Sequence, residues 1–415
     1  MPNEALFRNE SLKEIERVFQ SFGFLTIDTP TFESLKVLKA KGGIGEDSKL
    51  IFEMTTDDVG LRYDWTVSLA RYVAMHQNLP LPFKRYAIGK AWRREEPQRL
   101  RYREFTQADV DIVGGRSSAS DAEILGAVGL ALDGLELDYT VLVNDRRFMD
   151  GLLESIGIRE VLWQGVMRSI DKLDKIGRDG VMEQLQTQGL NRDQLAKIDS
   201  LINMEDTNEN KLDYVGSLLN EQDAVDEMRG TLDLLKAYKM DGKVKIDFSI
   251  VRGLDYYTGI VFEFKANGEK TKSTIAAGGR YDKLIGMLSG RQVPAVGCSI
   301  GVDRALEVLG FSDSTRYTYA SVYVANIKDD NYPYALAVAN RLRDSGIAVD
   351  LNSASRNISN QLAYANSLKF RYALIVGDAE EKALKVKFRD LIDGSENTMA
   401  LEDAVKIIKK GVNVK

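Results

Sequence analysis

The chain has 415 residues, 44% of them hydrophobic and 28% charged, with a formal net charge of -6. This length and composition exclude a disordered chain and are enough for two or three domains, each with its own core. A single cysteine, Cys298, excludes a disulfide framework and is typical of a reducing compartment. The N-terminal stretch carries acids and no apolar core, and no run approaches the ~18 apolar residues of a membrane span, so we expect a cytoplasmic protein without membrane contact.

The scarcity of histidine narrows the chemistry further. With His76 as the only histidine, the chain cannot build a Cys/His zinc site, and a Ser-His-Asp triad could form only around that residue. His76 follows an apolar stretch and precedes QNLPLP, which favours a structural role. The sequence has no GxxxxGK(S/T) loop, and GGIG at 42–45 lacks the flanking pattern of a dinucleotide site. Any bound phosphate must therefore be held by side chains.

In chain order, the pattern predicts a helix over 4–21, an extended stretch broken at Pro30, and a strand end that leads into a helix over 61–77. From 84 to 113 the apolar residues alternate with a period of two. Between about 150 and 242 the pattern is helical, and KVKIDFSIV at 243–251 returns to alternation. Four apolar residues of the helical block are expected on one face: Val166, Ile170, Leu173 and Ile176. A helical block thus interrupts a mostly antiparallel sheet.

The composition shifts after Phe311 through SDSTRYT, which predicts a linker. Beyond it, the strand-like runs YASVYVANI, YALIV and LKVKF alternate with a helix near 332–346 and a last helix, LEDAVKIIKK. This alternation is typical of a small α/β domain. The predicted fold class is therefore α+β, an antiparallel-sheet domain with a helical insertion, followed by a C-terminal α/β domain.

The stretch RREEPQRLRYREF at 93–105 carries five arginines in eleven residues, which is unusual in an acidic protein. A solvated hairpin tip is the plain explanation of such a charge run. The runs on either side alternate and are joined by EPQRL, so they predict a β-hairpin. One face of its second strand holds Arg103, Phe105, Gln107, Asp109 and Asp111, which are poor core material.

The first strand of this hairpin places Ala87, Gly89 and Ala91 on a single face. If odd-numbered residues pair with odd-numbered residues, these small side chains leave room above the sheet, and the polar residues complete the floor of a pocket. A face washed by solvent is the alternative.

Two further stretches carry unusual residues. In AVGCSIGVDRALEVL at 295–309, Arg304 falls in the first turn of a predicted helix, where the macrodipole disfavours a cation. Either an anion binds nearby or an acid such as Asp303 pairs with Arg304. SIVRGLDYYTGIVFEF and AAGGRYDKL both place glycine beside arginine and tyrosine, as if backbone must come close to a ligand, although paired tyrosines are more often packing.

Together these stretches resemble the class II aminoacyl-tRNA synthetases. WRRE at 92–95 with its arginine-rich loop resembles their motif 2, GVDRAL at 301–306 resembles motif 3, and FGFLTIDTPTFES resembles motif 1 more loosely. RGLDYYTGIVFE at 252–263 and AAGGRYDKL at 276–284 resemble the two signatures peculiar to histidyl-tRNA synthetase, and SIDKLDKIG is also similar to that family. The resemblance implies a catalytic core in two parts, 1–150 and 243–313, a helical insertion at 151–242 and an anticodon-binding domain at 318–415.

The resemblance implies that histidine is activated with ATP to histidyl-adenylate and then passed to the 3'-end of tRNA(His). Because the substrate carboxylate is already the nucleophile, the site must supply positive charge at the α-phosphate and alignment rather than a base. By match to the motifs, Arg252 and Arg93 contact the α-phosphate, with Arg252 as the catalytic residue. The other implied ATP-binding residues are Glu95 near the adenine, Arg101 at the outer phosphates, and Phe105 and Arg304, which sandwich the base.

The same match implies the histidine pocket. Asp64, Thr66 and Gln107 match positions that take the ammonium group, and Asp111 matches the acid that meets an imidazole nitrogen. Tyr257, with Tyr256 and Tyr281, closes the ring pocket. Many relatives have glutamate where Asp64 and Asp111 stand, and proline where Tyr63 stands. The resemblance also implies Mg²⁺ accompanying ATP, with no protein ligands assigned to the metal, and a homodimer, because motif 1 lies at the subunit interface in this class.

Two alternatives remain open at this point. The regulatory subunit of ATP phosphoribosyltransferase is a synthetase paralogue that senses histidine without catalysis, but it usually lacks the anticodon domain and degrades the catalytic arginine motif. A class II synthetase for another amino acid, such as proline or threonine, is the second. RGLDYY, AAGGRYDKL and the absence of Cys/His metal ligands count against that second alternative.

Overall fold

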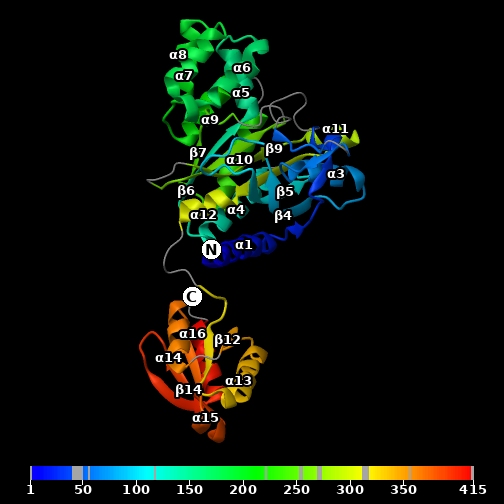
Figure 1. Ribbon diagram of the computed structural model, residues 1–415. Helices are drawn as coiled ribbons and strands as arrows, with labels where there is room; N and C mark the ends of the chain where they lie inside the picture. The colour runs from blue at the N-terminus through cyan, green and yellow to red at the C-terminus, as the bar shows by residue number, and fades with distance from the viewer. Residues whose placement is uncertain are drawn as a thin grey trace. The chain divides into compact units, whose positions relative to one another are not determined.

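The computed structural model describes residues 2–39, 50–54, 57–115, 118–219, 222–251, 256–268, 273–310, 317–354 and 357–412. Residues 11–310 form one compact unit, and residues 1–10 with 311–415 form a second (Figure 1). Among the described residues, no helix is both long and apolar enough to cross a membrane.

The larger unit is built on a sheet of eight strands in the order β1-β4-β5-β10-β9-β8-β6-β7. The strands are β1 (Leu25–Thr26), β4 (Phe83–Trp92), β5 (Glu104–Val113), β6 (Tyr139–Asp145), β7 (Val244–Ile246), β8 (Ile260–Ala266), β9 (Thr274–Arg280) and β10 (Ala295–Gly301). Neighbours from β4 to β6 pair antiparallel, and only the outermost pairs, β1 with β4 and β6 with β7, are parallel. The predicted antiparallel sheet of an α+β domain is confirmed.

The predicted hairpin is formed by β4 and β5, and odd-numbered residues face odd-numbered residues across it. Gly89 lies opposite Gln107, and Ala87 lies opposite Asp109. The register continues into β10, where Gly297 and Ser299 face Asp111 and Asp109. Because side chains alternate along a strand, all these odd-numbered positions share one face of the sheet.

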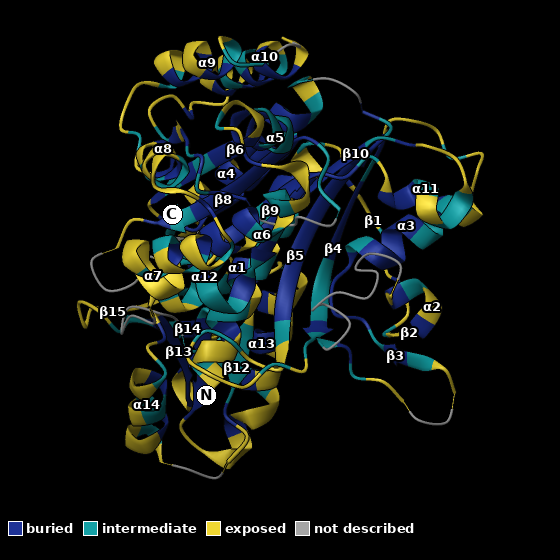
Figure 2. Cartoon of the chain, turned by 90° about the horizontal axis from the view of Figure 1, so that it is seen from above, coloured by how far each residue is buried: buried dark blue, intermediate teal, exposed yellow. Residues whose placement is uncertain are grey.

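The even-numbered side chains of the same strands form the main core. Val110 and Ile300 pack there with Phe262 of β8 and with the helix α4 (Ser118–Gly134). This helix is apolar on nearly all sides, as its burial in Figure 2 shows, and such a helix is stable only inside a protein. The two faces of the sheet therefore differ, one apolar and sealed, the other polar.

Shorter elements complete the larger unit. The helix α1 (Pro2–Ser21), of which residues 11–21 belong to this unit, confirms the helix predicted over 4–21. Two short strands that come before β4 in the chain, β2 (Phe32–Ser34) and β3 (Val59–Leu61), form a separate antiparallel pair. The remaining helices of this part are α2 (Leu35–Leu38), α3 (Thr66–Met75), α11 (Leu284–Ser289) and α12 (Val302–Leu309).

The predicted helical block lies between β6 and β7 in the chain, and most of its helices gather at one end of the sheet, while its last helix lies beside α4 (Figure 1). It consists of α5 (Arg146–Ser155), α6 (Glu160–Ile170), α7 (Leu173–Thr187), α8 (Arg192–Ile202), α9 (Asn208–Gly216) and α10 (Asp223–Ala237). The prediction of one shared apolar face is wrong for Ile176, which is 39% exposed. The chain turns between α6 and α7, so the period of α6 does not carry over into the next helix.

The smaller unit has a five-stranded sheet in the order β12-β11-β13-β14-β15, formed by β11 (Val322–Asn326), β12 (Val349–Leu351), β13 (Tyr372–Val376), β14 (Lys385–Asp390) and β15 (Glu396–Ala400). Its helices are the 3₁₀ turn η2 (Asp329–Asn331), α13 (Tyr332–Asp344), α14 (Ile358–Ser367), α15 (Asp378–Ala383) and α16 (Leu401–Val412). The predicted α/β character is confirmed, with three parallel strands followed by an antiparallel pair. The two edge strands, β12 and β15, carry weak apolar patterns and were not predicted.

The core of the larger unit can be tested at Phe264, which is fully buried and whose ring centroid lies 5.4 Å from that of Tyr139. We expect Phe264→Ala to lower the free energy of unfolding by about 3–5 kcal/mol, because a large cavity replaces the ring. All three tryptophans, Trp65, Trp92 and Trp163, belong to this unit, so fluorescence during urea unfolding reports on it alone. The control is Leu130→Ala, 49% exposed, for which we expect a change below about 0.5 kcal/mol. Equal losses for the two variants would contradict this description of the core.

Candidate active site

An acid and an arginine are buried together at one end of the polar face. Asp111 on β5 is 3% exposed, and Arg85 lies opposite it on β4. Arg85 Nη2 is 3.0 Å from Asp111 Oδ2, and Tyr281 donates a hydrogen bond of 2.5 Å to Asp111 Oδ1. Burial and the neighbouring carboxylate raise the pKa of Tyr281 well above its ordinary value, so the phenol remains a donor. Asp111 is thus fixed in place by two side chains.

Sequence reasoning identified Asp111 and Tyr281 but missed Arg85. The sequence did contain a signal for Arg85. Side chains alternate along a strand, so Arg85 lies on the same face as Ala87 and Gly89, which were predicted to line the polar face. A buried carboxylate needs a compensating charge. Arg85 supplies that charge from the neighbouring strand.

Glycines of β9 and β10 clear space for this cluster. A Cβ added to Gly297 would lie 1.9 Å from Asp111 Oδ1, and one added to Gly279 would lie 2.9 Å from the ring of Tyr257. These two glycines therefore leave space for the side chains of Asp111 and Tyr257, and not only for a ligand. The rings of Tyr256 and Tyr257 are tilted against each other with centroids 4.2 Å apart, and both pack against the cluster that contains Tyr281, the hydrogen-bond partner of Asp111. The predicted catalytic residue Arg252 lies outside the described residues.

The segment that precedes α3 lies over the first hairpin strand. Asp64 is buried, and its Oδ1 accepts a hydrogen bond from the backbone N–H of Val67 at 3.1 Å, while Thr66 begins the helix. The ring of Trp65 lies 2.8 Å from the position of a Cβ on Gly89. The Arg62 guanidinium stacks 3.5 Å above the Trp65 ring. The prediction that the small residues of this strand leave open room is therefore wrong at Gly89, because Trp65 fills the space.

Gln107 lies between the acid cluster and the arginine-rich end of the strand. Its side chain is 7% exposed, and its carbonyl oxygen has no hydrogen-bond partner within the part of the chain that the structure describes. Buried polar atoms are nearly always satisfied, so this oxygen is suited to a donor from a ligand. An ammonium group is such a donor.

The predicted ATP-binding residues lie around the start of β5 and α12. The Arg93 guanidinium lies 5.1 Å from the centroid of the Phe105 ring, and its Nε donates to the Tyr63 carbonyl at 3.1 Å. Arg101 Nη1 and Glu95 Oε2 are 3.9 Å apart. The Arg93 guanidinium therefore lies at the start of β5, beside the Phe105 ring, and Arg101 lies in the hairpin loop next to Glu95.

Arg304 occupies the first turn of α12, as predicted. It donates to the backbone carbonyls of Leu100 at 3.0 Å and Thr274 at 3.4 Å. Asp303 Oδ2 accepts from the backbone N–H of Thr106 at 2.6 Å, which fixes α12 beside the strand that carries Phe105. Carbonyl acceptors thus account for a cation at this helix start.

The hairpin tip also reaches α12, since Arg99 Nε donates to Glu307 Oε1 at 2.9 Å. Phe105 and Asp111 are six residues apart on one strand, so about 20 Å separates the arginine-rich end from the acid cluster. The polar face thus offers an anion-binding region and a cation-binding region along one line.

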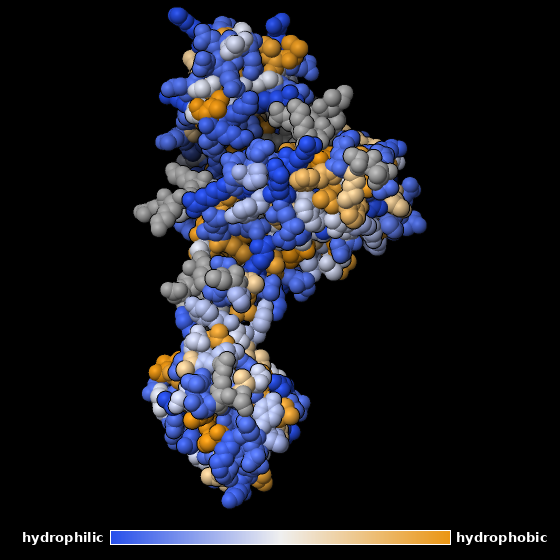
Figure 3. All heavy atoms as spheres, in the orientation of Figure 1, coloured by the Kyte–Doolittle hydropathy of each residue, from blue (hydrophilic) through white to orange (hydrophobic). Residues whose placement is uncertain are grey.

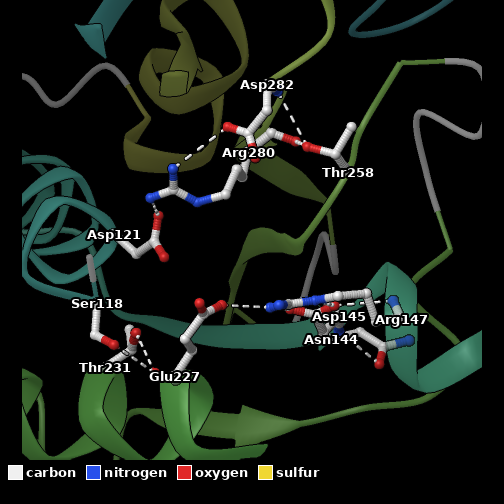
Figure 4. Close-up of polar contacts among 10 residues, drawn as sticks. All are labelled: Ser118, Asp121, Asn144, Asp145, Arg147, Glu227, Thr231, Thr258, Arg280 and Asp282. Atoms are coloured by element: carbon white, nitrogen blue, oxygen red, sulfur yellow. Dashed lines mark hydrogen bonds and ion pairs between the residues drawn. The ribbon is translucent and has the colours of Figure 1, made fainter. Parts of the chain in front are cut away.

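A cavity of about 310 Å³ lies elsewhere in the larger unit and is lined by Arg147, Glu227, Thr258, Gly259, Arg280, Asp282, Gln292 and Pro294. Figure 4 shows its two ion-pair groups, Arg280 with Asp121 and Arg147 with Glu227. Burial outweighs the arginine and raises the pKa of Asp121 to about 6. Arg280 also donates to the Gly115 carbonyl at 2.9 Å. Of the predicted substrate residues that the structure describes, none lines this cavity, and Arg280 serves to anchor the strand end from which Tyr281 extends.

The antiparallel sheet, the arginine-bearing hairpin and the helix with Arg304 define a class II aminoacyl-tRNA synthetase. Residues 1–305 match the family described as Histidyl-tRNA synthetase, and residues 321–411 match the family described as Anticodon binding domain. The chain therefore belongs to the histidyl-tRNA synthetase family.

Relatives of this family match along nearly the whole chain. The histidine–tRNA ligase of Clostridium tetani is 36% identical over 99% of this chain and 96% of its own length. That of Aeropyrum pernix is 38% identical over 99% of this chain and 95% of its own. The crystal structure of histidyl-tRNA synthetase from Nostoc sp. PCC 7120 superposes with a TM-score of 0.89 at 31% identity, covering 99% of this chain and 96% of that one.

Gly297→Ala tests the close approach at the acid cluster. We expect the Michaelis constant for histidine to rise about tenfold or more, because the new methyl group displaces the Asp111 carboxylate, while the constant for ATP is unchanged. ATP–pyrophosphate exchange measures both constants. Gly268→Ala is the matched control, since a Cβ there meets nothing within 4 Å. Parallel losses for both substrates would argue against a specific effect on Asp111.

Proposed function

We propose that the polar face carries out histidine activation with ATP and that the histidyl group then passes to the 3'-end of tRNA(His). The observation that carries this proposal is the buried Asp111, held by Arg85 and Tyr281, on the same strand as Phe105, whose ring lies 5.1 Å from the Arg93 guanidinium. An acid at one end suits an imidazole, and arginines at the other end suit a polyphosphate. About 20 Å of strand lies between the two ends.

The chemical step needs no protein base. The substrate carboxylate attacks the α-phosphorus of ATP, the bond to the β-phosphate oxygen breaks, and pyrophosphate leaves. Arg93, together with Arg252, stabilises the charge that develops on the α-phosphate oxygens. The fixed fork of a guanidinium matches two phosphate oxygens at once. Phe105 and Arg304 hold the base, Glu95 contacts it, and Arg101 binds the outer phosphates.

Selection of histidine depends on paired polar groups. Asp111 accepts an N–H of the imidazole, and its position is fixed by Arg85 and Tyr281. Tyr256 and Tyr257 close the ring pocket. Asp64, Thr66 and the unpartnered oxygen of Gln107 take the ammonium group. An analogue without the ring nitrogens would not supply the N–H that Asp111 accepts in addition to its bonds from Arg85 and Tyr281, so the pocket disfavours it.

We propose that Mg²⁺ binds together with ATP. The described residues contain no group of three or more His, Cys, Asp or Glu side chains that could hold a metal ion. Mg²⁺ commonly keeps several waters and binds through substrate phosphates with one or two carboxylates. MgATP as the substrate therefore fits the residues present.

The tRNA and a second subunit are the proposed macromolecular partners. We assign anticodon binding to residues 318–415 and acceptor-arm contact to the helical block. Exposed apolar residues of the larger unit support a dimer: Leu25 and Phe32 lie in the motif 1 segment, and Met75 and Met287 belong to α3 and α11, where Figure 3 shows apolar surface. The proposed location is the cytoplasm.

The activity is tested by ATP–pyrophosphate exchange with each of the twenty amino acids, without tRNA. We expect exchange with histidine alone, because only an imidazole satisfies Asp111. Arg252→Ala is expected to lower the exchange rate by about a thousandfold, as loss of a preorganised transition-state contact does. Exchange with no amino acid at all would favour a histidine-sensing regulatory paralogue, and exchange with proline or threonine would favour another class II enzyme.

The dimer is tested by sedimentation velocity at the concentration used for activity. We expect a species of twice the chain mass. Phe32→Glu introduces a charge into the apolar surface and is expected to shift the population toward monomer, while Leu384→Glu, an exposed site in the smaller unit, leaves it unchanged. A wild-type monomer under these conditions would overturn the dimer proposal.

A further inference from the structure

One buried acid of the polar face has no role in the assignments above. Asp109 lies between Gln107 and Asp111 on β5, and all three side chains share the face that carries the site. Asp109 is 2% exposed, and Ser299 of β10 donates a hydrogen bond of 2.5 Å to its Oδ1. Its partner across the hairpin is Ala87, which leaves the space above the strand to the carboxylate.

The spacing along the strand places Asp109 where the substrate's amino group falls. Side chains two residues apart are about 6.8 Å apart, so Gln107 and Asp111 are separated by about 13.6 Å at their Cα atoms. In histidine the amino nitrogen and the far ring nitrogen are about 6 Å apart, as covalent dimensions dictate. A histidine whose ring meets Asp111 therefore has its ammonium group at the level of Asp109, and Gln107 reaches it only along its longer side chain.

The charges around Asp109 favour a cation at this point. Groups that interact with it electrostatically come from β4, β5, β10, the segment before α3 and the end of β9: Arg85, Asp111, Cys298, Arg62, Asp64 and Tyr281. Arg85 forms its ion pair with Asp111 at 3.0 Å, so Asp109 shares this cation with a second acid. Two further carboxylates, those of Asp64 and Asp111, lie close enough to repel its charge.

Burial, followed by the repulsion from Asp111 and Asp64, raises the pKa of Asp109 to about 7 against the opposing effect of Arg85. Near neutral pH, about half of the molecules therefore carry a proton on this carboxyl. An ammonium group beside it favours the ionised form and lowers its pKa. Binding of the cation and loss of the proton are then linked.

We propose that Asp109 is an ammonium acceptor of the histidine pocket, acting with Gln107, and that the protonated carboxyl releases its proton to solvent as the amino acid binds. The balance is simple: a carboxylic acid and an ammonium ion become a carboxylate–ammonium pair and one free proton. This inference rests on the proposed function, and it adds a pH-dependent affinity to it. Histidine then binds more weakly as the pH falls through about 7, because the neutral carboxyl must first ionise.

Asp109→Asn tests the proposal, since the amide imitates the protonated acid at nearly the same volume. The Michaelis constant for histidine in pyrophosphate exchange is measured from pH 5.5 to 8.5 for the wild type and the variant. We expect the variant's constant to be at least about tenfold higher at pH 8.5, with the ratio shrinking toward one near pH 5.5. The imidazole of the substrate titrates equally in both proteins, so it cancels from this ratio. The constant for ATP is expected to be unchanged.

Calorimetry of histidine binding in two buffers of different ionisation enthalpy gives a second readout. At pH 7 we expect the wild type to release about half a proton more per bound histidine than Asp109→Asn, as a pKa of about 7 requires. Asp133→Asn is the control, because Asp133 is an exposed acid that pairs with Lys243 at 2.7 Å and lies outside the proposed histidine pocket. It should match the wild type in both measurements.

Ser299→Ala keeps the test decisive if the asparagine variant does not fold, which tryptophan fluorescence reveals. The Ser299 hydrogen bond favours the ionised form of Asp109, so its loss raises the pKa of this carboxyl. The pH midpoint at which the Michaelis constant for histidine rises is therefore expected to move to higher pH. A ratio that stays constant across the pH range, equal proton release, or an unmoved midpoint would overturn the proposal. Wild-type protein that shows no exchange with histidine would instead contradict the proposed function, and calorimetry would still report whether histidine binds.

Discussion

The register of three antiparallel strands determines which side chains of this protein can meet. β4, β5 and β10 pair so that Arg85, Asp111 and Gly297 stand in one row and Ala87, Asp109 and Ser299 in the next. A slip by one residue would turn every one of these side chains into the apolar core. The core on the opposite face, with α4 packed against it, opposes such a slip, so the hydrophobic pattern of the even-numbered residues fixes the chemistry of the odd-numbered ones.

Burial gives the site its selectivity and carries a cost. Asp64, Asp109 and Asp111 are nearly inaccessible to water, with Arg62 and Arg85 as the nearby cations. Charged groups in such surroundings are destabilising unless each finds a partner. A substrate that brings both an ammonium group and ring N–H donors completes this set of partners. The excess of buried acids over cations, which destabilises the protein without its substrate, therefore favours histidine over amino acids that lack a second polar group.

Strand parity allowed the sequence to predict much of the site, and tertiary packing set the limit. Gln107, Asp111 and the small residues of β4 could be placed on one face because the period of two is strong. Arg85 escaped notice since an arginine near a strand start resembles an ordinary surface residue. Trp65 fills the space over Gly89, and no local pattern foretells which distant ring takes such a gap. The turn between α6 and α7 likewise had no clear local signal, so Ile176 was predicted to continue the apolar face of α6 but is partly exposed.

The contact between Asp111 and Gly297 limits how this pocket can change over generations. The carboxylate lies so close to the neighbouring strand that even one methyl group on Gly297 would collide with it. A glutamate at position 111 needs space for one more methylene while Arg85 and Tyr281 still hold the carboxylate from two sides. The exchange of one acid for the other therefore requires compensating changes at its neighbours. These positions should vary together across lineages rather than one at a time.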